Sequence, residues 1–261
     1  MQRKVRVGAV SYLNTKPLIY GIEKGMIKKE ADLLIDYPSK IASMLLEDGI
    51  DVGLVPVAII PQMKEYHIIS DYCIGSVGAV ASVCLFSEVP LEKIKTVLLD
   101  YQSRTSVALL KVLIKNYWKI EVTFEETSGH YQSQISGTTA GLVIGDRALE
   151  QRKISSFIYD LGEEWEKFTG LPFVFAAWIS NKKLDQDFIN RFNKANSFGL
   201  DKIDEVVRQN SYEVFDLHHY YTDCISFEMD EKKKKRLELF LKCLTLKSIH
   251  LFKAKIFSWI L

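Results

Sequence analysis

The sequence lacks the patterns that mark most metal, disulfide and nucleotide sites. Its four cysteines lie far apart and form no CxxC pair, so we expect free thiols rather than zinc ligands or a disulfide. The five histidines show no metal-ligand spacing, because the adjacent His218 and His219 would point to different faces of a helix. GxSxG is absent, and the glycine-rich segment 75–82 has neither a phosphate-loop lysine nor a dinucleotide fingerprint. The motifs of the sequence therefore give no support for a metal site or a nucleotide-binding loop.

Net charge is also nearly absent. Thirty-four basic residues balance 33 acidic ones, and the net charge of +1 gives no broad field for nucleic acid or for an anionic membrane. The lysine run at 232–235 precedes apolar residues at helical spacing, which is typical of a solvated helix face. We expect no nucleic-acid partner, and any anionic ligand must be recognised locally.

Long apolar runs are missing as well. No run reaches the roughly 20 residues that cross a bilayer, so no membrane span is predicted. Residues 239–261 are interrupted by lysines and have the spacing of an amphipathic helix, which we expect to pack on its own protein; a membrane-surface role is the alternative. The first residues do not resemble a secretory signal, so a cytoplasmic location is the expectation.

What is present is an alternation of short β-branched runs with longer helical patterns. The chain has 261 residues, of which 48% are hydrophobic, enough for one large or two modest domains. The alternation predicts α/β layers on largely parallel strands. Pro17 opens the first predicted helix, and Ser39 is the predicted N-cap of the second. The first unit is β-α-β-α-β, with strands at 5–12, 33–38 and 51–60 and helices at 17–25 and 39–49.

Two long β-prone runs, at 72–87 and 171–182, bracket a second α/β pattern. The elements predicted between them are strands at 96–100 and 121–126, a helix at 103–118, and a strand running into a helix over 140–151. The chain is therefore expected to leave one lobe, build a second and return, before three helical segments complete the sequence. We predict lobe 1 over residues 1–88 plus 179–261 and lobe 2 over residues 89–178.

Polar side chains follow the predicted strands, where ligands bind in open α/β sheets. The first polar stretch contains Ser11, Tyr12, Asn14 and Thr15. Pro17 needs no N–H in the first helical turn, so the residues before it form a loop with free donors. The alternative is that Asn14 or Thr15 merely caps the helix.

A second polar stretch, residues 100–106, lies between a strand and a helix. The first N–H groups of that helix would point at an anion such as a carboxylate, aided by the Ser and Thr hydroxyls and by Arg104. The alternative is N-capping by Ser103 with Arg104 in solvent.

Three further residues are candidates for the site, and two of them have alternative interpretations. Gly145 ends a strand and allows a ligand to approach closely. Asp146 would cap the next helix, which is the simpler interpretation, or accept a substrate hydroxyl. Ser82 would either face the cleft or be a satisfied core hydroxyl.

Several of these segments together resemble one known family. The motifs are VSYLNTKPL, DVGLVPVA, IGSVGAVASV, LDYQSRTSVALLKVL, VIGDRAL and YDLGEEWEKFTGLPFVFAAW. In this order they resemble the menaquinone-biosynthesis chorismate dehydratases of the futalosine route, over roughly residues 5–200. The resemblance implies a two-lobed type II periplasmic-binding-protein-like fold, with a mostly parallel sheet in each lobe and the ligand cleft between them. It also implies a carbon–oxygen lyase that removes water from chorismate, giving 3-[(1-carboxyvinyl)oxy]benzoate, without a metal or an organic cofactor.

The resemblance also implies roles for single residues. Asn14 would hydrogen-bond the departing hydroxyl or orient the substrate, and Ser82 would contact the enolpyruvyl carboxylate. The other carboxylate is assigned to the helix start at Ser103, Thr105 and Ser106. The remaining predicted substrate-binding residues are Ser11, Tyr12, Arg104, Gly145 and Asp146. The base stays open, because no Glu, Asp or His in the motifs is an obvious one and the enolpyruvyl carboxylate could itself take the proton.

Three other functions share parts of this pattern. A non-catalytic protein that binds small carboxylates would use the same fold, because a fold alone never establishes an activity. A 1,4-dihydroxy-6-naphthoate synthase has a related two-lobed fold, yet the SYLNTKP loop lacks the motif associated with that enzyme. A transcription-factor effector domain fits less well, because no helix-turn-helix precedes the first strand. A monomer or a homodimer is expected.

Overall fold

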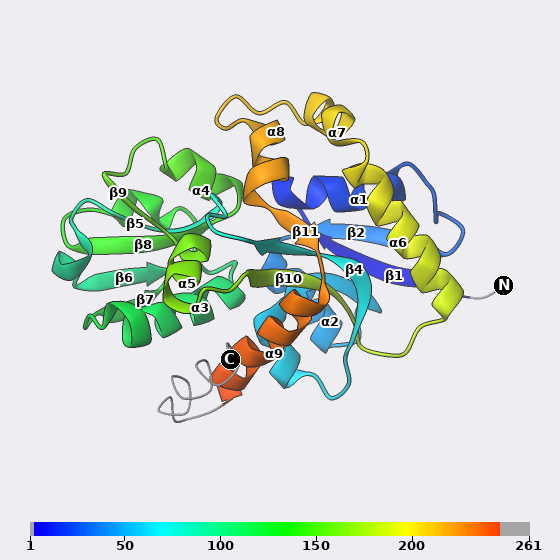
Figure 1. Cartoon of the computed structure of the whole chain (residues 1–261), viewed down its shortest axis with the longest axis horizontal. Helices are drawn as coiled ribbons and strands as arrows, with labels where there is room; N and C mark the ends of the chain where they lie inside the picture. The colour runs from blue at the N-terminus through cyan, green and yellow to red at the C-terminus, as the bar shows by residue number, and fades with distance from the viewer. Residues whose placement is uncertain (1–2, 246–261) are drawn as a thin grey trace.

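The structure, a computed structural model that describes residues 3–245, consists of two α/β lobes side by side (Figure 1). The larger lobe contains a sheet with the strand order β11 (Ser226–Glu228), β4 (His67–Ser76), β10 (Phe173–Ser180), β3 (Val52–Pro56), β1 (Val5–Val10) and β2 (Ala31–Asp36). The smaller lobe contains a sheet with the order β7 (Thr123–Glu126), β6 (Thr96–Leu99), β8 (Thr139–Ile144), β5 (Val83–Ser87) and β9 (Phe157–Asp160). The predicted two-lobed α/β class is confirmed.

Both sheets mix parallel and antiparallel strands. β1 runs parallel to β2 and β3, and β6 runs parallel to β7 and β8. In contrast, β10 pairs antiparallel with β3 and β4, and β5 pairs antiparallel with β8 and β9. The expected parallel order therefore holds for the βαβ parts only. The reason is that β5 and β10 enter their sheets from the junction of the lobes, whereas β1, β3, β6 and β8 end there.

Helices cover the faces of both sheets (Figure 1). They are α1 (Lys16–Glu23), α2 (Pro38–Leu46), α3 (Thr105–Leu113), α4 (Asp146–Gln151), α5 (Leu161–Thr169), α6 (Gln186–Leu200), α7 (Ile203–Gln209), α8 (Leu217–His219) and α9 (Glu231–Thr245). α1 and α6 pack against each other through Gly21 and Gly199. A Cβ atom at Gly199 would lie 1.9 Å from the carbonyl oxygen of Pro17, so only glycine permits this approach. The contact fixes the start of α1, next to the loop that carries Asn14.

Three local expectations need correction. Ser39 is not an N-cap: α2 begins at Pro38 after the extended Tyr37, without a side-chain cap. The helix expected over 103–118 is regular only in α3 and continues as one π-helical turn over Ile114–Trp118. After Lys182, where three helical segments were expected, the described residues form α6 to α9 and the short strand β11.

The last described helix packs on the body of the protein. Phe240 of α9 makes edge-to-face contacts with Trp165 and Phe173. The remainder of the predicted amphipathic helix, residues 246–261, lies outside the described residues. Among residues 3–245 no helix has the length and the apolar composition needed to cross a membrane.

The chain crosses between the lobes twice, before β5 and before β10. β5 belongs to the smaller sheet, although the predicted limit of lobe 1 lies after it, at residue 88. β10 belongs to the larger sheet, although it begins before the predicted limit at residue 179. The limits of the lobes at 1–88 plus 179–261 and 89–178 stay a prediction.

Candidate active site

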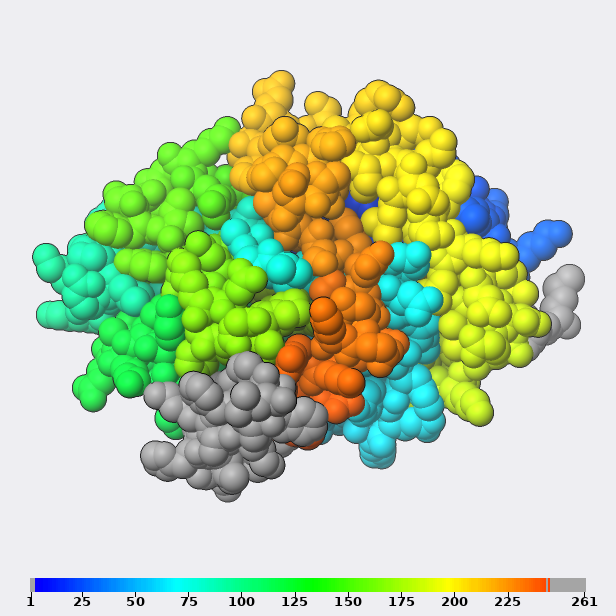
Figure 2. All heavy atoms as spheres, viewed as in Figure 1, coloured from blue at the N-terminus to red at the C-terminus, as the bar shows by residue number. Residues whose placement is uncertain are grey.

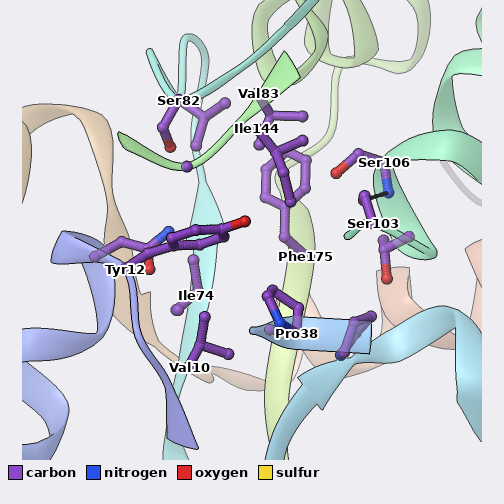
Figure 3. A pocket seen from close by; sticks show the side chains of 16 residues that line it. Val10, Tyr12, Pro38, Ile74, Ser82, Val83, Ser103, Ser106, Ile144 and Phe175 are labelled. Atoms are coloured by element: carbon purple, nitrogen blue, oxygen red, sulfur yellow. Dashed lines mark hydrogen bonds between the residues drawn. The ribbon is translucent and has the colours of Figure 1, made fainter. Parts of the chain in front are cut away.

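A small cavity of about 50 Å³ lies between the two lobes (Figure 3). Apolar side chains form much of the lining, among them Val10, Ile74, Val83, Ile144 and Phe175. The polar lining residues are Tyr12, Asn14, Ser82, Ser103, Thr105 and Ser106. None of the residues that line this cavity is charged, so hydroxyl, amide and backbone N–H groups must recognise any ligand.

Asn14 lies in the 3-10 turn Leu13–Thr15, between β1 and α1. Its side chain is buried, with 8% of the residue exposed, and it lines the cavity. Neither Asn14 nor Thr15 caps α1 with its side chain, so the capping alternative is wrong. Instead Asn14 Oδ1 accepts a hydrogen bond from Thr15 Oγ1 at 3.3 Å. This contact orients the amide and leaves its N–H groups as donors.

Ser82 lies beside Asn14, and the two share a buried partner. Tyr220 is completely buried, and its hydroxyl donates a hydrogen bond to Ser82 Oγ at 2.6 Å. Burial raises the pKa of Tyr220 well above its ordinary value, and the Asn14 side chain also hydrogen-bonds the Tyr220 hydroxyl. We call Asn14 and Ser82 the Asn14–Ser82 wall. Ser82 therefore lines the cavity, and its hydroxyl also has a buried hydrogen-bond partner in Tyr220. Both predicted interpretations of Ser82 apply.

The backbone before Ser82 is strained. Ala81 has φ of +63°, and Ser82 N–H donates to the carbonyl of Val80 at 2.8 Å, which makes a tight γ-turn. The Asp160 carboxylate holds this turn, because it accepts from the N–H groups of Val80 at 3.0 Å and Ala81 at 2.7 Å. On the other side, Gly145 N–H donates to the Ser82 carbonyl at 2.8 Å. The position of Ser82 is thus fixed by backbone contacts as well as by Tyr220.

The opposite side of the cavity is the start of α3, and Figure 3 shows Ser103 and Ser106 across from Ser82 and Tyr12. Ser103 Oγ accepts from the Ser106 N–H at 3.1 Å, so the capping alternative holds for Ser103. Thr105 Oγ1 accepts from the Ala58 N–H of the larger lobe at 3.1 Å. Ser106 also lines the cavity. We call Ser103, Thr105 and Ser106 the α3 wall, where a helix N-terminus favours an anion.

Tyr12 connects the two lobes at the edge of the cavity. Its hydroxyl donates to Gln102 Oε1, and Arg147 donates to the same oxygen of Gln102 at 2.9 Å. Arg147 also forms an ion pair with the buried Asp100 at 2.9 Å. The Tyr12 ring covers Gly145, where φ is +66° and a Cβ would lie 2.7 Å from the ring. At Gly145 we expected a ligand to approach the backbone closely. In the structure the Tyr12 ring occupies that space.

Three predicted site residues do not line the cavity. Ser11 is exposed to solvent. Arg104 donates to Ser43 Oγ of the larger lobe at 3.0 Å, so it is not free in solvent. Asp146 does not cap α4; its Oδ1 accepts from the Leu13 N–H at 3.0 Å and so connects the lobes. Burial raises the pKa of Asp146 to about 6. The roles assigned to these three residues stay predictions.

The other seven predicted residues do line the cavity: Tyr12, Asn14, Ser82, Ser103, Thr105, Ser106 and Gly145. Sequence reasoning missed Phe175, which is buried among the apolar lining, and Tyr220 behind Ser82. Phe175 lies within the motif LPFVFAAW, so its place in a β-prone run was a usable signal. Tyr220 gave no signal, because 138 positions separate it from Ser82.

Among residues 3–245 no group of three or more His, Cys, Asp or Glu side chains is placed to hold a metal ion. The arrangement provides neutral donors on two facing walls and an apolar floor. Such a site can hold an anionic, partly apolar small molecule at both ends and shield it from water.

Comparison with known proteins agrees with this geometry. The chain matches the family described as menaquinone biosynthesis over residues 5–245. The chorismate dehydratase of Thermus thermophilus is 25% identical over 264 residues, covering 92% of this chain and 95% of that protein. The chorismate dehydratase of Campylobacter jejuni is 26% identical over 247 residues, covering 90% of this chain and 95% of that protein.

Solved structures agree on the fold. A Candida albicans protein, described as exhibiting the generic periplasmic binding protein structural fold, superposes with a TM-score of 0.62 at 12% identity. The superposition covers 98% of this chain and 95% of that one. The predicted periplasmic-binding-protein-like fold is confirmed. Because the family match extends over residues 5–245, the chain belongs to the menaquinone-biosynthesis family.

Proposed function

We propose that this protein is a chorismate dehydratase, a hydro-lyase of menaquinone biosynthesis. The observation that carries the proposal is the cavity between the lobes, which presents uncharged donors on two facing walls. Family membership and the two chorismate dehydratase relatives support the same substrate. Chorismate has a carboxylate at each end of an apolar ring, and this distribution suits donors at two ends of an apolar cavity.

The reaction needs little chemistry from the protein. The ring carbon that bears the enolpyruvyl ether loses a proton, and the electron pair of that C–H bond forms the last double bond of the aromatic ring. The neighbouring carbon loses its hydroxyl group, which combines with the proton released from the ring and leaves as water. Aromatisation provides the driving force. The protein must hold the reactive conformer, stabilise the departing oxygen and exclude competing rearrangements.

The Asn14–Ser82 wall suits the reacting end of the substrate. The Asn14 amide keeps an N–H group to hydrogen-bond the departing hydroxyl, because its Oδ1 accepts from Thr15 and only one N–H is needed for Tyr220. Ser82 also lines the cavity, and in this proposal it donates to the enolpyruvyl carboxylate. The α3 wall suits the ring carboxylate, through the Ser106 hydroxyl and the positive end of the helix dipole.

We propose that the substrate's enolpyruvyl carboxylate accepts the proton. The lining residues include no Asp, Glu, His or Lys, so none of them provides a base at the ring. Asp146, which has a pKa of about 6, accepts from the Leu13 N–H and is not part of the lining. An intramolecular base needs only the correct conformer, which the two walls would select.

Chorismate turnover tests the proposal directly. We expect purified protein to convert chorismate into an aromatic product, followed by ultraviolet absorbance and by a mass lower by one water. An Asn14→Asp variant is the matched control for activity from contaminants. Binding of chorismate without conversion would support a small-carboxylate-binding protein instead. Conversion of the cyclic futalosine intermediate, with chorismate left intact, would identify a 1,4-dihydroxy-6-naphthoate synthase.

We also propose that the enzyme acts in the cytoplasm, as a monomer or a homodimer. Cys73, Cys84 and Cys224 are buried free thiols, which suits a reducing compartment. Light scattering after gel filtration measures the mass, and a tetramer or larger particle would contradict the proposed state.

A further inference from the structure

We propose that Tyr220 is a positioning residue, whose buried hydroxyl fixes the orientation of Ser82 and Asn14. The inference rests on the proposed function and extends it to a residue that does not line the cavity. Tyr220 donates to Ser82 Oγ at 2.6 Å and also hydrogen-bonds the Asn14 side chain. One hydroxyl therefore contacts both members of the Asn14–Ser82 wall from behind.

The direction of the Tyr220 hydrogen bond determines what Ser82 can do. Tyr220 has one hydroxyl proton and gives it to Ser82 Oγ. The Ser82 hydroxyl then keeps its own proton for another acceptor, and its side chain lines the cavity. The contact therefore turns Ser82 into a donor aimed at a carboxylate. Without it, the Ser82 hydroxyl would rotate among its rotamers and lose part of its orientation.

Tyr220 does not act as the base. Burial raises its pKa well above the ordinary value, so the phenol stays protonated. It is fully buried, and a buried hydroxyl without a partner carries a free-energy cost. The hydrogen bonds to Ser82 and Asn14 offset that cost. The same bonds that stabilise Tyr220 in the core therefore orient the wall.

The segment that carries Tyr220 is rigidly attached. Asp216 caps α8 by accepting from the N–H groups of His218 and His219. Tyr220 begins the π-helical turn that follows, and its ring packs edge to face on Phe215. Figure 2 shows this segment, in orange, lying across the junction of the two lobes. A residue late in the chain therefore supports two site residues, Asn14 and Ser82, that come much earlier in the sequence.

Tyr221 provides a matched control. It is the next residue, it is 2% exposed, and none of the described residues provides a hydrogen-bond partner for its hydroxyl. Tyr221→Phe removes the same atom from the same turn without removing a described hydrogen bond. A general effect of deleting a buried phenol oxygen would appear in both variants. An effect on the Asn14–Ser82 wall would appear in Tyr220→Phe alone.

The first experiment measures chorismate turnover in these variants. Tyr220→Phe is expected to lower kcat by about 10-fold to 100-fold with KM changed less than about threefold, whereas Tyr221→Phe keeps the wild-type kcat. When Tyr220→Phe is combined with Ser82→Ala, the loss in kcat is expected to be smaller than the product of the two single losses. Equal kcat in Tyr220→Phe and wild type, or fully multiplicative losses, would overturn the inference.

A second measurement depends neither on turnover nor on the folding of Tyr220→Phe. In wild-type protein with labelled tyrosine, NMR is expected to detect the slowly exchanging hydroxyl proton of Tyr220. Ser82→Ala removes the acceptor, so this resonance should shift or disappear. A resonance that does not change in Ser82→Ala would refute the contact even if chorismate is not the substrate. Absence of turnover in wild type, with the shift present, would instead refute the proposed function alone.

Discussion

The two walls of the cavity are built in different ways. The Asn14–Ser82 wall joins the turn after β1 to the segment before β5, with Tyr220 behind both. The α3 wall is a single strand-to-helix turn, in which Ser103 caps its own helix and Thr105 contacts Ala58. The first wall depends on long-range contacts that restrain its polar groups, and the second is mostly local. This difference supports the proposal that the reacting atoms lie at the first wall and that the second wall holds the substrate.

The largest effect is expected from Asn14→Asp. The new carboxylate would repel a dianionic substrate and would present an acceptor where the departing hydroxyl needs a donor. We expect kcat to fall by about 10²-fold to 10³-fold, measured as formation of the aromatic product. Asn14→Asp with full turnover would contradict the catalytic role of Asn14. It would also remove the contrast between the two walls.

Gly145→Ala tests the contact between Gly145 and Tyr12 at the edge of the cavity. The φ of +66° is strained for alanine, and its Cβ would lie 2.7 Å from the Tyr12 ring. We expect the free energy of unfolding to fall by about 1–3 kcal/mol, measured by chemical denaturation. Gly129→Ala is the control, because no heavy atom lies within 4 Å of a Cβ at that position. Similar stability of the two variants would contradict a tight contact between Tyr12 and Gly145.

Ser106→Ala tests whether the α3 wall binds the substrate without taking part in the reaction. The Ser106 hydroxyl lines the cavity, and its loss should weaken substrate binding without affecting the departing oxygen. We expect KM to rise by about fivefold to tenfold, with kcat within about threefold of wild type, in steady-state kinetics. A collapse of kcat at unchanged KM would place the α3 wall at the reacting atoms and reverse the assignment.

Asp146→Asn is expected to have the smallest effect, and it depends on pH. The pKa of Asp146 is about 6 in the folded protein against 3.8 for the ordinary group, so folding favours the protonated form. The stability that this form contributes is complete below about pH 4 and is lost as the pH rises through about 6. At pH 8 the Tm of Asp146→Asn should exceed that of wild type by about 2–4 °C. At pH 4 the two Tm values should agree, and a constant difference would contradict the shifted pKa.

The sequence predicted best what is local. The β1–turn–α1 unit follows from an apolar run, a polar loop and Pro17, and all three lie within a few residues. The start of α3 follows in the same way from a strand, hydroxyl residues and a helical pattern. Both segments line the cavity, because strands that end at the junction bring their loops together.

What the sequence did not predict depends on contacts between distant residues. The directions of β5 and β10 follow from where the chain crosses between the lobes, which periodicity does not encode. Asp146 looks like a cap from its position at a helix start, yet it accepts from Leu13 of the other lobe. Tyr220 reaches Ser82 only through the tertiary fold. Local propensity contains no information on such pairs.

The γ-turn at Ala81 has a consequence for protein engineering. An alanine held at φ of +63° lowers the stability of the folded chain, whereas glycine adopts that conformation without penalty. A selection for thermal tolerance alone should therefore favour glycine at this position. The same exchange would give the backbone next to Ser82 more conformational freedom. The protein would gain thermal stability, and the Ser82 hydroxyl would be held less firmly in one orientation.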